Sequence, residues 1–519
     1  MKKKLLFGLK IITGFIIMII FIVLVGYLWP TSLLDTPKYY NETLITSVNV
    51  VDVETGDILT DRNILINKNT IVKIDSFPIN TSREHLVIDG SGKFLIPGLW
   101  DMHTHSNQQS ELLHHPLYIA NGVTGVRDMS GQLNERDSYW VGSKERLQWN
   151  KDLENNNRVT PRYVLQSSYQ MDGEKAIPNG ALNFFKLQNP EQVDSLLKFY
   201  KNEKVDFIKI YAQLPKDTYL ELAKKAPTYG LHIAGHKPMF LSLKEAINAG
   251  QRSFEHGRIF MYECFSEADS LKSSKNWKQY FKKSKEKILT QFDSLKAKQL
   301  MQLMAEKKAY WTPTLQTLKF EAFAHKTAFT DNRNLKYVTK VRKQLWWGFD
   351  TEYNKKRNLE TKGISVSEQF FEASKKQVKM ARDLGVPIMA GTDVTDSYVF
   401  AGFSLHDELL ELTKSGLSNL EALQAATIIP AKYSNALNDF GTIAIGKKAD
   451  LVLLDSNPLE NIKNTKKIHG VMLNGLYYDS TKIEKLKKFT ESSASSLHIN
   501  IKTLANLFNS PLIRVQFAD

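Results

Sequence analysis

The stretch PGLWDMHTHS, residues 97–106, is the most informative segment for the fold of this chain. It places His103 and His105 at the end of a short apolar run. Side chains alternate between the two faces of a strand, so both imidazoles point the same way, and two nitrogen ligands from one strand suit Zn²⁺. Such a pair is common by chance, however, and two hydrogen-bonded histidines at a barrel rim would have the same spacing.

Four further polar residues stand in or at the ends of separate apolar segments: Lys209 in VDFIKIYA, His236 in GLHIAGHKP, His256 in RSFEHG and Asp393 in PIMAGTDV. Any one of them alone has a structural explanation, such as a hydrogen-bonded buried histidine or an aspartate that caps a helix. An unpaired ammonium inside a buried strand is costly, so Lys209 needs a specific role. Together with the two histidines above, these residues converge as a metal-dependent active site at one barrel face requires.

Short apolar strands alternate with helical stretches after residue 98, which indicates an α/β fold with a parallel sheet. The candidate strands number eight, as in a (β/α)8 TIM barrel. They are Leu99–His105, Val123–Met129, Arg162–Ser167, Phe207–Ala212, His232–His236, Ser253–His256, Tyr310–Thr314 and Pro387–Thr392. Before the barrel, residues 44–98 have the turn-punctuated β pattern of an antiparallel unit, and residues 441–482 resemble it. We expect the two ends of the chain to form one small β-sandwich.

The amino terminus has the pattern of a membrane anchor. Four lysines lie within residues 2–10, and residues 11–34 contain no charged side chain, which is long enough for a helix to cross a bilayer. The apolar run is longer than the core of a typical signal peptide, so we expect a single-pass anchor that is not cleaved. The lysines should stay cytoplasmic, which places the catalytic domain outside the cytoplasm.

The net charge of +14 first suggests a nucleic-acid partner. Two segments account for this charge: the four amino-terminal lysines, and residues 258–360, which have a net charge of +11. The rest of the chain is nearly neutral. No nucleic-acid-binding module is present, so we expect no nucleic-acid partner. The one cysteine, Cys264, excludes an intrachain disulfide and a thiolate zinc site.

These patterns divide the chain into several parts. They are a lysine-rich tip with the membrane helix (1–34), a linker (35–43), the sandwich (44–98 and 441–482), the barrel (99–440) and a carboxyl-terminal tail (483–519). Residues 258–308 are lysine-rich and too long for a plain connection, so we expect a helical insertion over the barrel mouth.

The order of the motifs resembles the amidohydrolase superfamily, in its branch of metal-dependent, prolidase-like dipeptidases and imidazolonepropionase-like proteins. The resemblance covers residues 44–480 and rests on PGLWDMHTHS, NGVTGVRDMSG, DFIKIYA, HIAGHKP, SFEHG, AGTDV and the closing run at 405–462, which contains GTIAIGKKADLVLLD. The resemblance implies a hydrolase of amide, peptide or cyclic amide bonds that acts on a small molecule or small peptide.

The resemblance also implies a centre of two divalent ions, with zinc as the expected metal. His103, His105 and Asp393 would hold one ion and His236 and His256 the other, while Lys209, carboxylated by carbon dioxide, would bridge both. A water between the two ions would become the nucleophile, and Asp393 would act as the general base. Barrels of this type often pair, so a homo-oligomer is an expectation too.

Two residues are candidates for contacting the substrate. Tyr211 lies two residues after Lys209 on the same face of the strand, and a tyrosine at this place contacts the substrate in the dipeptidase branch. Arg127 ends the second predicted strand beside Asp128, where a salt bridge within the barrel rim is an equal alternative. We expect His114 and His115 on a helix surface, and His232 and His406 in structural roles.

Two other functions are compatible with the same fold. A heterocycle deaminase would use the metal barrel, but deaminases of this superfamily usually bind one metal and do not need the lysine at position 209. A non-catalytic scaffold is disfavoured because scaffold relatives generally lose ligands, whereas this sequence has the full set.

Overall fold

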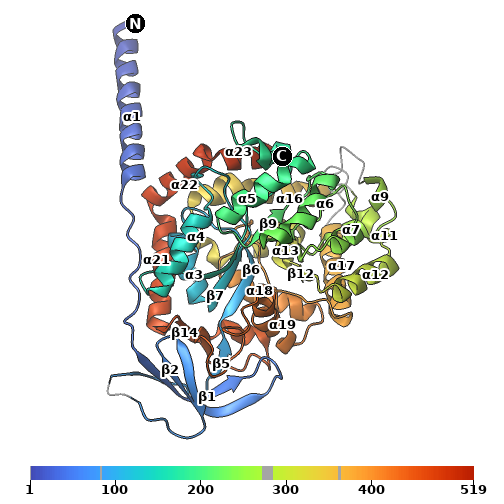
Figure 1. The fold of residues 1–519 in the computed structure, drawn as a ribbon. Helices are drawn as coiled ribbons and strands as arrows, with labels where there is room; N and C mark the ends of the chain where they lie inside the picture. Colours follow the sequence, from blue (N-terminus) through green and yellow to red (C-terminus); the bar gives the residue numbers. More distant parts are fainter. Residues whose placement is uncertain (1, 82–83, 272–283, 361–363, 519) are drawn as a thin grey trace.

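The computed structural model describes residues 2–81, 84–271, 284–360 and 364–518. The chain forms a barrel of parallel strands with helices around it, and an extra β-sheet lies at one end of the barrel (Figure 1). A long helix, α1 (Lys2–Leu28), projects beyond the opposite end (Figure 1).

The barrel is built from seven strands and one bridged segment. Its strands pair in parallel as β6–β7–β8 and β9–β10–β11–β12. They are β6 (Leu99–Thr104), β7 (Val123–Asp128), β8 (Arg162–Gln166), β9 (Phe207–Ile210), β10 (His232–Gly235), β11 (Ser253–Glu255) and β12 (Tyr310–Thr312). Residues 387–394 take the eighth place, because Ile388 bridges Trp311 and Val394 bridges Thr104. A bridge between Ser167 and Phe207 joins the two sheets, so the ring closes and the predicted TIM-barrel-type fold is confirmed.

Helices between the strands form the outer layer of the barrel. The α-helices of this layer are α2 (Ser110–Leu113), α3 (His115–Ala120), α4 (Ser143–Glu154), α5 (Val193–Asn202), α6 (Lys216–Lys225), α7 (Leu243–Asn248), α12 (Ser294–Glu306), α17 (Ile364–Asp383), α18 (Phe403–Lys414), α19 (Asn419–Ala425) and α20 (Ile428–Tyr433). Short 3₁₀ helices in the connections are η1 (Glu174–Ala176), η2 (Asn183–Lys186), η3 (Pro190–Gln192), η4 (Ala226–Tyr229) and η7 (Ile462–Lys466). Helices α7 and α19 begin with Ser-x-x-Glu capping boxes, which satisfy their first backbone N–H groups.

Strands from both ends of the chain form the extra sheet. They are β1 (Glu42–Val51), β2 (Ile58–Asn67), β3 (Thr70–Asp75), β4 (Leu86–Asp89), β5 (Phe94–Pro97), β13 (Leu451–Leu454), β14 (Ile468–Leu473) and β15 (Leu476–Asp479). The order β15–β14–β13–β5–β1–β2–β3, with β4 on β1, is one hydrogen-bonded sheet and not the two sheets of the expected sandwich. The opening unit is also not purely antiparallel, because β1 pairs in parallel with β4 and β5.

The expected insertion at 258–308 is shorter than predicted. Its described helices are α8 (Ile259–Glu263), α9 (Ala268–Leu271), α11 (Lys285–Thr290) and α12, and residues 272–283 lie outside the described residues. Helix α12 packs on α7 and α17 as part of the outer layer. Its buried residues Ala297, Leu300, Met301 and Met304 recur at helical spacing, a stripe that the lysine content obscured.

A second insertion, which the sequence analysis missed, follows β12. It contains α13 (Leu315–Phe323), α14 (Thr327–Thr330), η5 (Arg333–Tyr337), α15 (Lys340–Arg342), the π-helical turn η6 (Lys343–Trp347) and α16 (Gly348–Glu360). The carboxyl-terminal tail is helical as well: α21 (Ser480–Ser495), α22 (Leu497–Asn509) and α23 (Pro511–Ala518). Helices α22 and α23 lie at the end of the barrel opposite the extra sheet (Figure 1).

Candidate metal centre

The mouth of the barrel lies at the end away from the extra sheet. Strand β6 starts beside that sheet, where the Gly98 N–H donates to the carbonyl of Asp450. Because the barrel strands are parallel, all their carboxyl ends point away from the sheet. His103 and His105 end β6, His236 and His256 follow β10 and β11, and Asp393 closes the eighth segment.

Asp393 is the common neighbour of three of the four histidines. Its Oδ1 lies 3.0 Å from His105 Nε2 and 3.2 Å from His103 Nε2, and its Oδ2 lies 3.4 Å from His256 Nδ1. The fourth histidine, His236, contacts this cluster through His256, because the Nε2 atoms of the two side chains are 2.8 Å apart. Five side chains from four separate barrel strands therefore converge on one point.

Burial keeps three of these imidazoles neutral. It lowers the pKa of His105 to about 4, and the nearby Lys209 ammonium adds to the effect. Burial also holds the pKa values of His236 and His256 well below the usual range, and the positive charge of Arg258 contributes to both shifts. A neutral imidazole is the form that binds a cation, so these side chains are in the protonation state that a metal site needs.

The backbone at the centre is held in an unusual conformation. His256 and Asp393 have φ angles of 73° and 68°, in the left-handed region that non-glycine residues seldom adopt. Gly391 allows the close packing beside them, because a Cβ there would lie 2.9 Å from His103 Cβ. Strain of this kind clusters at functional sites, where the surrounding structure holds it in place.

The donor set fits a divalent cation. One donor atom from each of His103, His256 and Asp393 lies within 4.8 Å of the other two, and all three residues are buried. His103 Nε2 forms no hydrogen bond although Asp393 Oδ1 is 3.2 Å away. A buried nitrogen that lies near a carboxylate without a hydrogen bond is placed as a metal ligand would be, and nitrogen with carboxylate oxygen is a donor set typical of zinc.

Lys209 lies in the same cluster. It is 1% exposed, and its Nζ is 5.8 Å from the ring centre of Tyr211. Burial lowers the pKa of its ammonium to about 8, while the carboxylates of Asp393 and Glu255 oppose the shift. A lysine with this pKa carries about a tenth of its amine in the neutral form at pH 7, far more than an exposed lysine does, and the neutral amine is the form that can react with carbon dioxide.

Residues 211–476, just over half of the chain, match the Amidohydrolase family. The chain belongs to the amidohydrolase family. It is therefore a hydrolase on a TIM-barrel-type fold, and its buried cluster of His103, His256 and Asp393 is the metal-site candidate.

Three solved structures share this fold. A Xaa-Pro dipeptidase with methionine bound in its active site is 20% identical, with a TM-score of 0.58 over 85% of this chain and 100% of that one. The bottromycin amidohydrolase AH is 20% identical, with a TM-score of 0.68 over 88% and 91%. Molinate hydrolase is 15% identical, with a TM-score of 0.57 over 85% and 95%. At these identities the likeness shows the fold alone.

One curated relative matches over a short stretch. It is the dihydroorotase of Carboxydothermus hydrogenoformans (strain ATCC BAA-161 / DSM 6008 / Z-2901), 44% identical over 89 residues. The match spans 16% of this amidohydrolase and about a fifth (20%) of the relative's length, so it identifies a shared segment.

Glu255, which the sequence analysis did not single out, supports the centre from below. It is 2% exposed, and its Oε2 lies 3.1 Å from His103 Nδ1 and 2.8 Å from a guanidinium nitrogen of Arg127. Burial would raise the pKa of this carboxyl, but Arg127 first and then His103 hold it at about 2. A carboxylate on the second nitrogen of a ligating histidine fixes its tautomer and orientation. The motif SFEHG contained an indication of this role, because Glu255 is an acidic residue inside an apolar strand.

Arg127 was a candidate for binding the substrate, and the structure corrects this prediction. Its side chain is fully buried, and its three nitrogens donate within the barrel, with Nε bound to the carbonyl of Met102. It pairs with Glu255 and not with its neighbour Asp128, which binds Arg146 instead. Arg127 therefore holds the Glu255 carboxylate in place from inside the barrel, and Glu255 in turn orients His103.

Tyr211 and Arg258 lie beside the ligands, with part of each side chain exposed. The Tyr211 ring stacks on His236 with their centres 4.1 Å apart. The Arg258 side chain is 32% exposed and pairs with Glu321 at 3.1 Å. The positive charge of Arg258 contributes a lowering of the pKa to each of Tyr211, His236 and His256. The Arg258 guanidinium therefore lies near all three side chains, at the mouth of the centre. Arg258 was not predicted as a site residue, although it lies two residues after His256.

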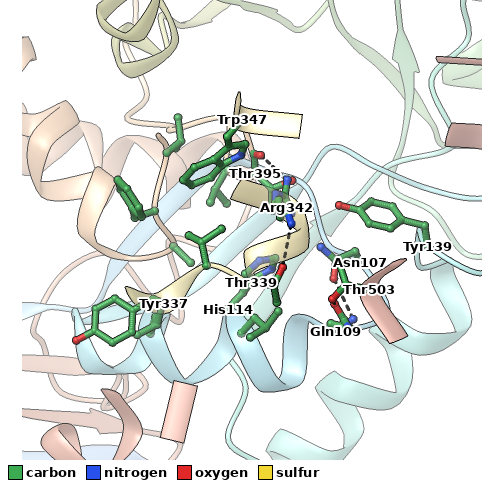
Figure 2. A pocket seen from close by; sticks show the side chains of 17 residues that line it. Asn107, Gln109, His114, Tyr139, Tyr337, Thr339, Arg342, Trp347, Thr395 and Thr503 are labelled. Carbon is green, nitrogen blue, oxygen red and sulfur yellow. Dashed lines mark hydrogen bonds between the residues drawn. The ribbon is translucent and has the colours of Figure 1, made fainter. Parts of the chain in front are cut away.

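A cavity of about 40 Å³ lies among the segments that follow the candidate ligands of β6 and of the eighth barrel segment. Its wall includes Asn107, two residues after His105, and Thr395, two residues after Asp393. Figure 2 shows Arg342 from the second insertion bound to Thr395 on one side, and Thr503 of α22 bound to Gln109 on the other. Both the second insertion and the carboxyl-terminal tail thus reach the loops that carry the ligands.

The four other histidines singled out in the sequence make structural contacts. His115, expected at a helix surface, is fully buried: its Nε2 lies 2.8 Å from the Tyr163 hydroxyl, and its ring meets Trp149 edge-on. His114 is partly buried, with Nδ1 3.0 Å from the Ser110 hydroxyl. His232 and His406 are held within the protein by hydrogen bonds, as expected.

Proposed function

We propose that this amidohydrolase hydrolyses a carbon–nitrogen bond with the help of two divalent metal ions. The observation that carries the proposal is the convergence of His103, His105 and His256 on the two oxygens of Asp393, with Lys209 buried in the same cluster. Family membership supports the reaction class, and the neutral imidazoles support metal binding.

In this proposal His103, His105 and Asp393 would hold one ion, and His236 with His256 would hold the other. Lys209, if carboxylated, would supply a further anionic ligand to the same centre. The carbamate would replace a buried ammonium by a group with two anionic oxygens, which removes the electrostatic repulsion between Lys209 and the cations. Zinc is the metal that this nitrogen-rich donor set favours.

The protein groups would then perform the proton transfers. The ions, when bound, supply a water acidic enough to attack at neutral pH and polarise the scissile carbonyl. Asp393 orients that water, accepts its proton, and delivers the proton to the leaving nitrogen. Glu255 and Arg127 keep His103 in one orientation throughout.

Tyr211 and Arg258 are our candidates for binding the substrate. A partly exposed guanidinium beside the ligands suits an anionic group such as the carboxylate of a small peptide or an acyl amino acid. The Tyr211 ring on His236 would form one wall for the adjoining side chain. Peptide-like substrates also agree with the Xaa-Pro dipeptidase among the structures of similar fold.

A hydrolysis panel with Arg258→Met tests this assignment. We expect kcat/KM for dipeptides with a free carboxylate to fall by about 10- to 100-fold, because a charge-assisted hydrogen bond is lost. The same dipeptides with an amidated carboxyl end should change by less than about threefold. Arg382→Met, which removes an arginine paired with Glu421 on the outer surface, is the matched control. Equal losses on free and amidated dipeptides would contradict the role of Arg258.

We also propose that α1 anchors the protein in a membrane as a single span, with the catalytic domain outside the cytoplasm. Within Leu5–Leu28 the most apolar part has a mean hydropathy of 2.9 and contains no buried residue, and the end of the helix at Gly26 contacts α22. Tyr27 and Trp29 stand where an interfacial aromatic belt would lie. The domain layout that accompanies the proposal is an anchor, a linker at 35–43, the extra sheet, the barrel and the helical tail.

A further inference from the structure

Helix α22 exposes an unusual apolar stripe. Leu497, Leu504 and Phe508 are 67%, 36% and 67% exposed. With Ile501 between them they are spaced by four, three and four residues, so all four side chains share one narrow face of the helix. Large apolar side chains in a contiguous exposed row on a soluble surface mark a contact with another apolar phase.

The opposite face of α22 is firmly attached to the barrel mouth. Thr503 donates its hydroxyl to Gln109 Oε1 at 2.7 Å, and Gln109 Nε2 donates to the carbonyl of Ile499 at 3.1 Å. Gln109 lies four residues after His105, so the helix is tied to the loop that follows two candidate ligands. The stripe therefore faces outward because the helix is fixed in that orientation, with buried Ile499 and Thr503 on the inner face.

The same stripe is continuous with the end of α1. Helices α1 and α22 pack against each other beside the mouth (Figure 1). Lys502 Nζ donates to the carbonyl of Trp29 at 2.6 Å. Gly26 faces the stripe so closely that a Cβ there would lie 2.5 Å from Ile501 Cδ1. The residues of α1 at the membrane boundary thus lie beside the apolar face of α22.

From these contacts we propose that the apolar face of α22 lies in the lipid bilayer beside α1 and holds the barrel mouth against the membrane surface. The inference rests on the proposed anchor. The sequence of α22 has the features of a helix lying in the plane of the interface: a narrow apolar face, Lys502 and His498 on its flank, and no acidic residue. Long lysine side chains at such a boundary keep the ammonium at the headgroups.

Spin labels on the full-length protein in nanodiscs of phosphatidylcholine and phosphatidylglycerol test the proposal. Leu504→Cys and Phe508→Cys report on the stripe, and Ile17→Cys reports on α1. Ile445→Cys is the matched aqueous control, because Ile445 is 63% exposed and lies beside the extra sheet, at the far end of the barrel. The wild-type chain is the labelling blank, since its one cysteine is buried. The measurement is the accessibility of each label to oxygen, which enriches in lipid, and to a water-soluble nickel chelate.

We expect the labels at 504 and 508 to be relaxed by oxygen and protected from nickel, as at 17, with the opposite result at 445. Labels at 504 and 508 that behave like the one at 445, while 17 stays in lipid, would overturn the placement of α22 and leave the anchor intact. A nickel-accessible label at 17 would overturn both. Broadening at 508 that disappears on dilution with unlabelled chain would show a second copy on this face and also overturn the proposal. Dipeptide hydrolysis by the same samples reports separately on the proposed reaction.

Discussion

Asp393→Asn is expected to lower kcat by about 1,000-fold or more, because an amide cannot accept a proton from the attacking water or pass it to the leaving group. The backbone should tolerate the change, since asparagine adopts the left-handed conformation at φ 68° about as readily as aspartate. The amide oxygen can still approach His105 and His103, so the bound metal should fall by less than half. The measurement pairs steady-state kinetics with metal analysis of the same sample.

Asp407→Asn is the control for this experiment. Asp407 lies on α18, 14 residues after Asp393, and pairs with Lys466 at 2.5 Å on the outside of the barrel. We expect this variant to keep the wild-type kcat. An Asp393→Asn protein with kcat within about tenfold of the wild type, at full metal content, would remove Asp393 from the proton transfers.

Lys209→Ala is expected to release metal and to lower kcat/KM by about 1,000-fold, since the bridge between the two ions is lost. The truncated side chain leaves a buried space, so acetate or propionate should enter it and restore part of the activity. Lys209→Met fills the same space without an anion and should not respond to either acid. A Lys209→Ala protein with unchanged metal and activity would contradict the bridging role.

The pH dependence of metal loading follows from the same lysine. Burial lowers the pKa of Lys209 to about 8, so the neutral amine that reacts with carbon dioxide becomes available at lower pH than for an exposed lysine. Loading of the metal-free protein with zinc, under the same partial pressure of carbon dioxide at each pH, should therefore be faster at pH 8.5 than at pH 6.5. The Lys209→Ala protein should lack this difference.

The convergence of the candidate ligands could be predicted from the sequence because each member follows a local rule. His103 and His105 share one face of a strand, and His236, His256 and Asp393 each follow an apolar segment, so the parallel barrel brings them to one end. The supporting layer follows no such rule. Glu255 reaches His103, and Arg127 reaches Glu255, only across the barrel interior, where partners 152 and 128 residues apart in sequence meet.

Other features depended on packing that the sequence does not display. Helix α12 looked like part of a charged insertion because it follows a lysine-rich segment, and because its four buried apolar residues are interleaved with Lys296 and Lys298. The second insertion contains Arg342 and Trp347 of the cavity wall, but its helices are short and have no motif to mark them. The sequence defined only the bounds of the carboxyl-terminal tail, whereas in the structure α22 reaches from the ligand loop at Gln109 to the end of α1.

Metal dependence of the purified full-length protein tests the central claim most directly. The protein is stripped with a chelator, dialysed, and titrated with zinc in the presence of bicarbonate while bound metal and dipeptide hydrolysis are measured on each sample. We predict negligible turnover in the stripped protein and activity that rises with bound metal to about two ions per chain. Full turnover by protein that retains less than about one-tenth of an ion per chain would contradict the account.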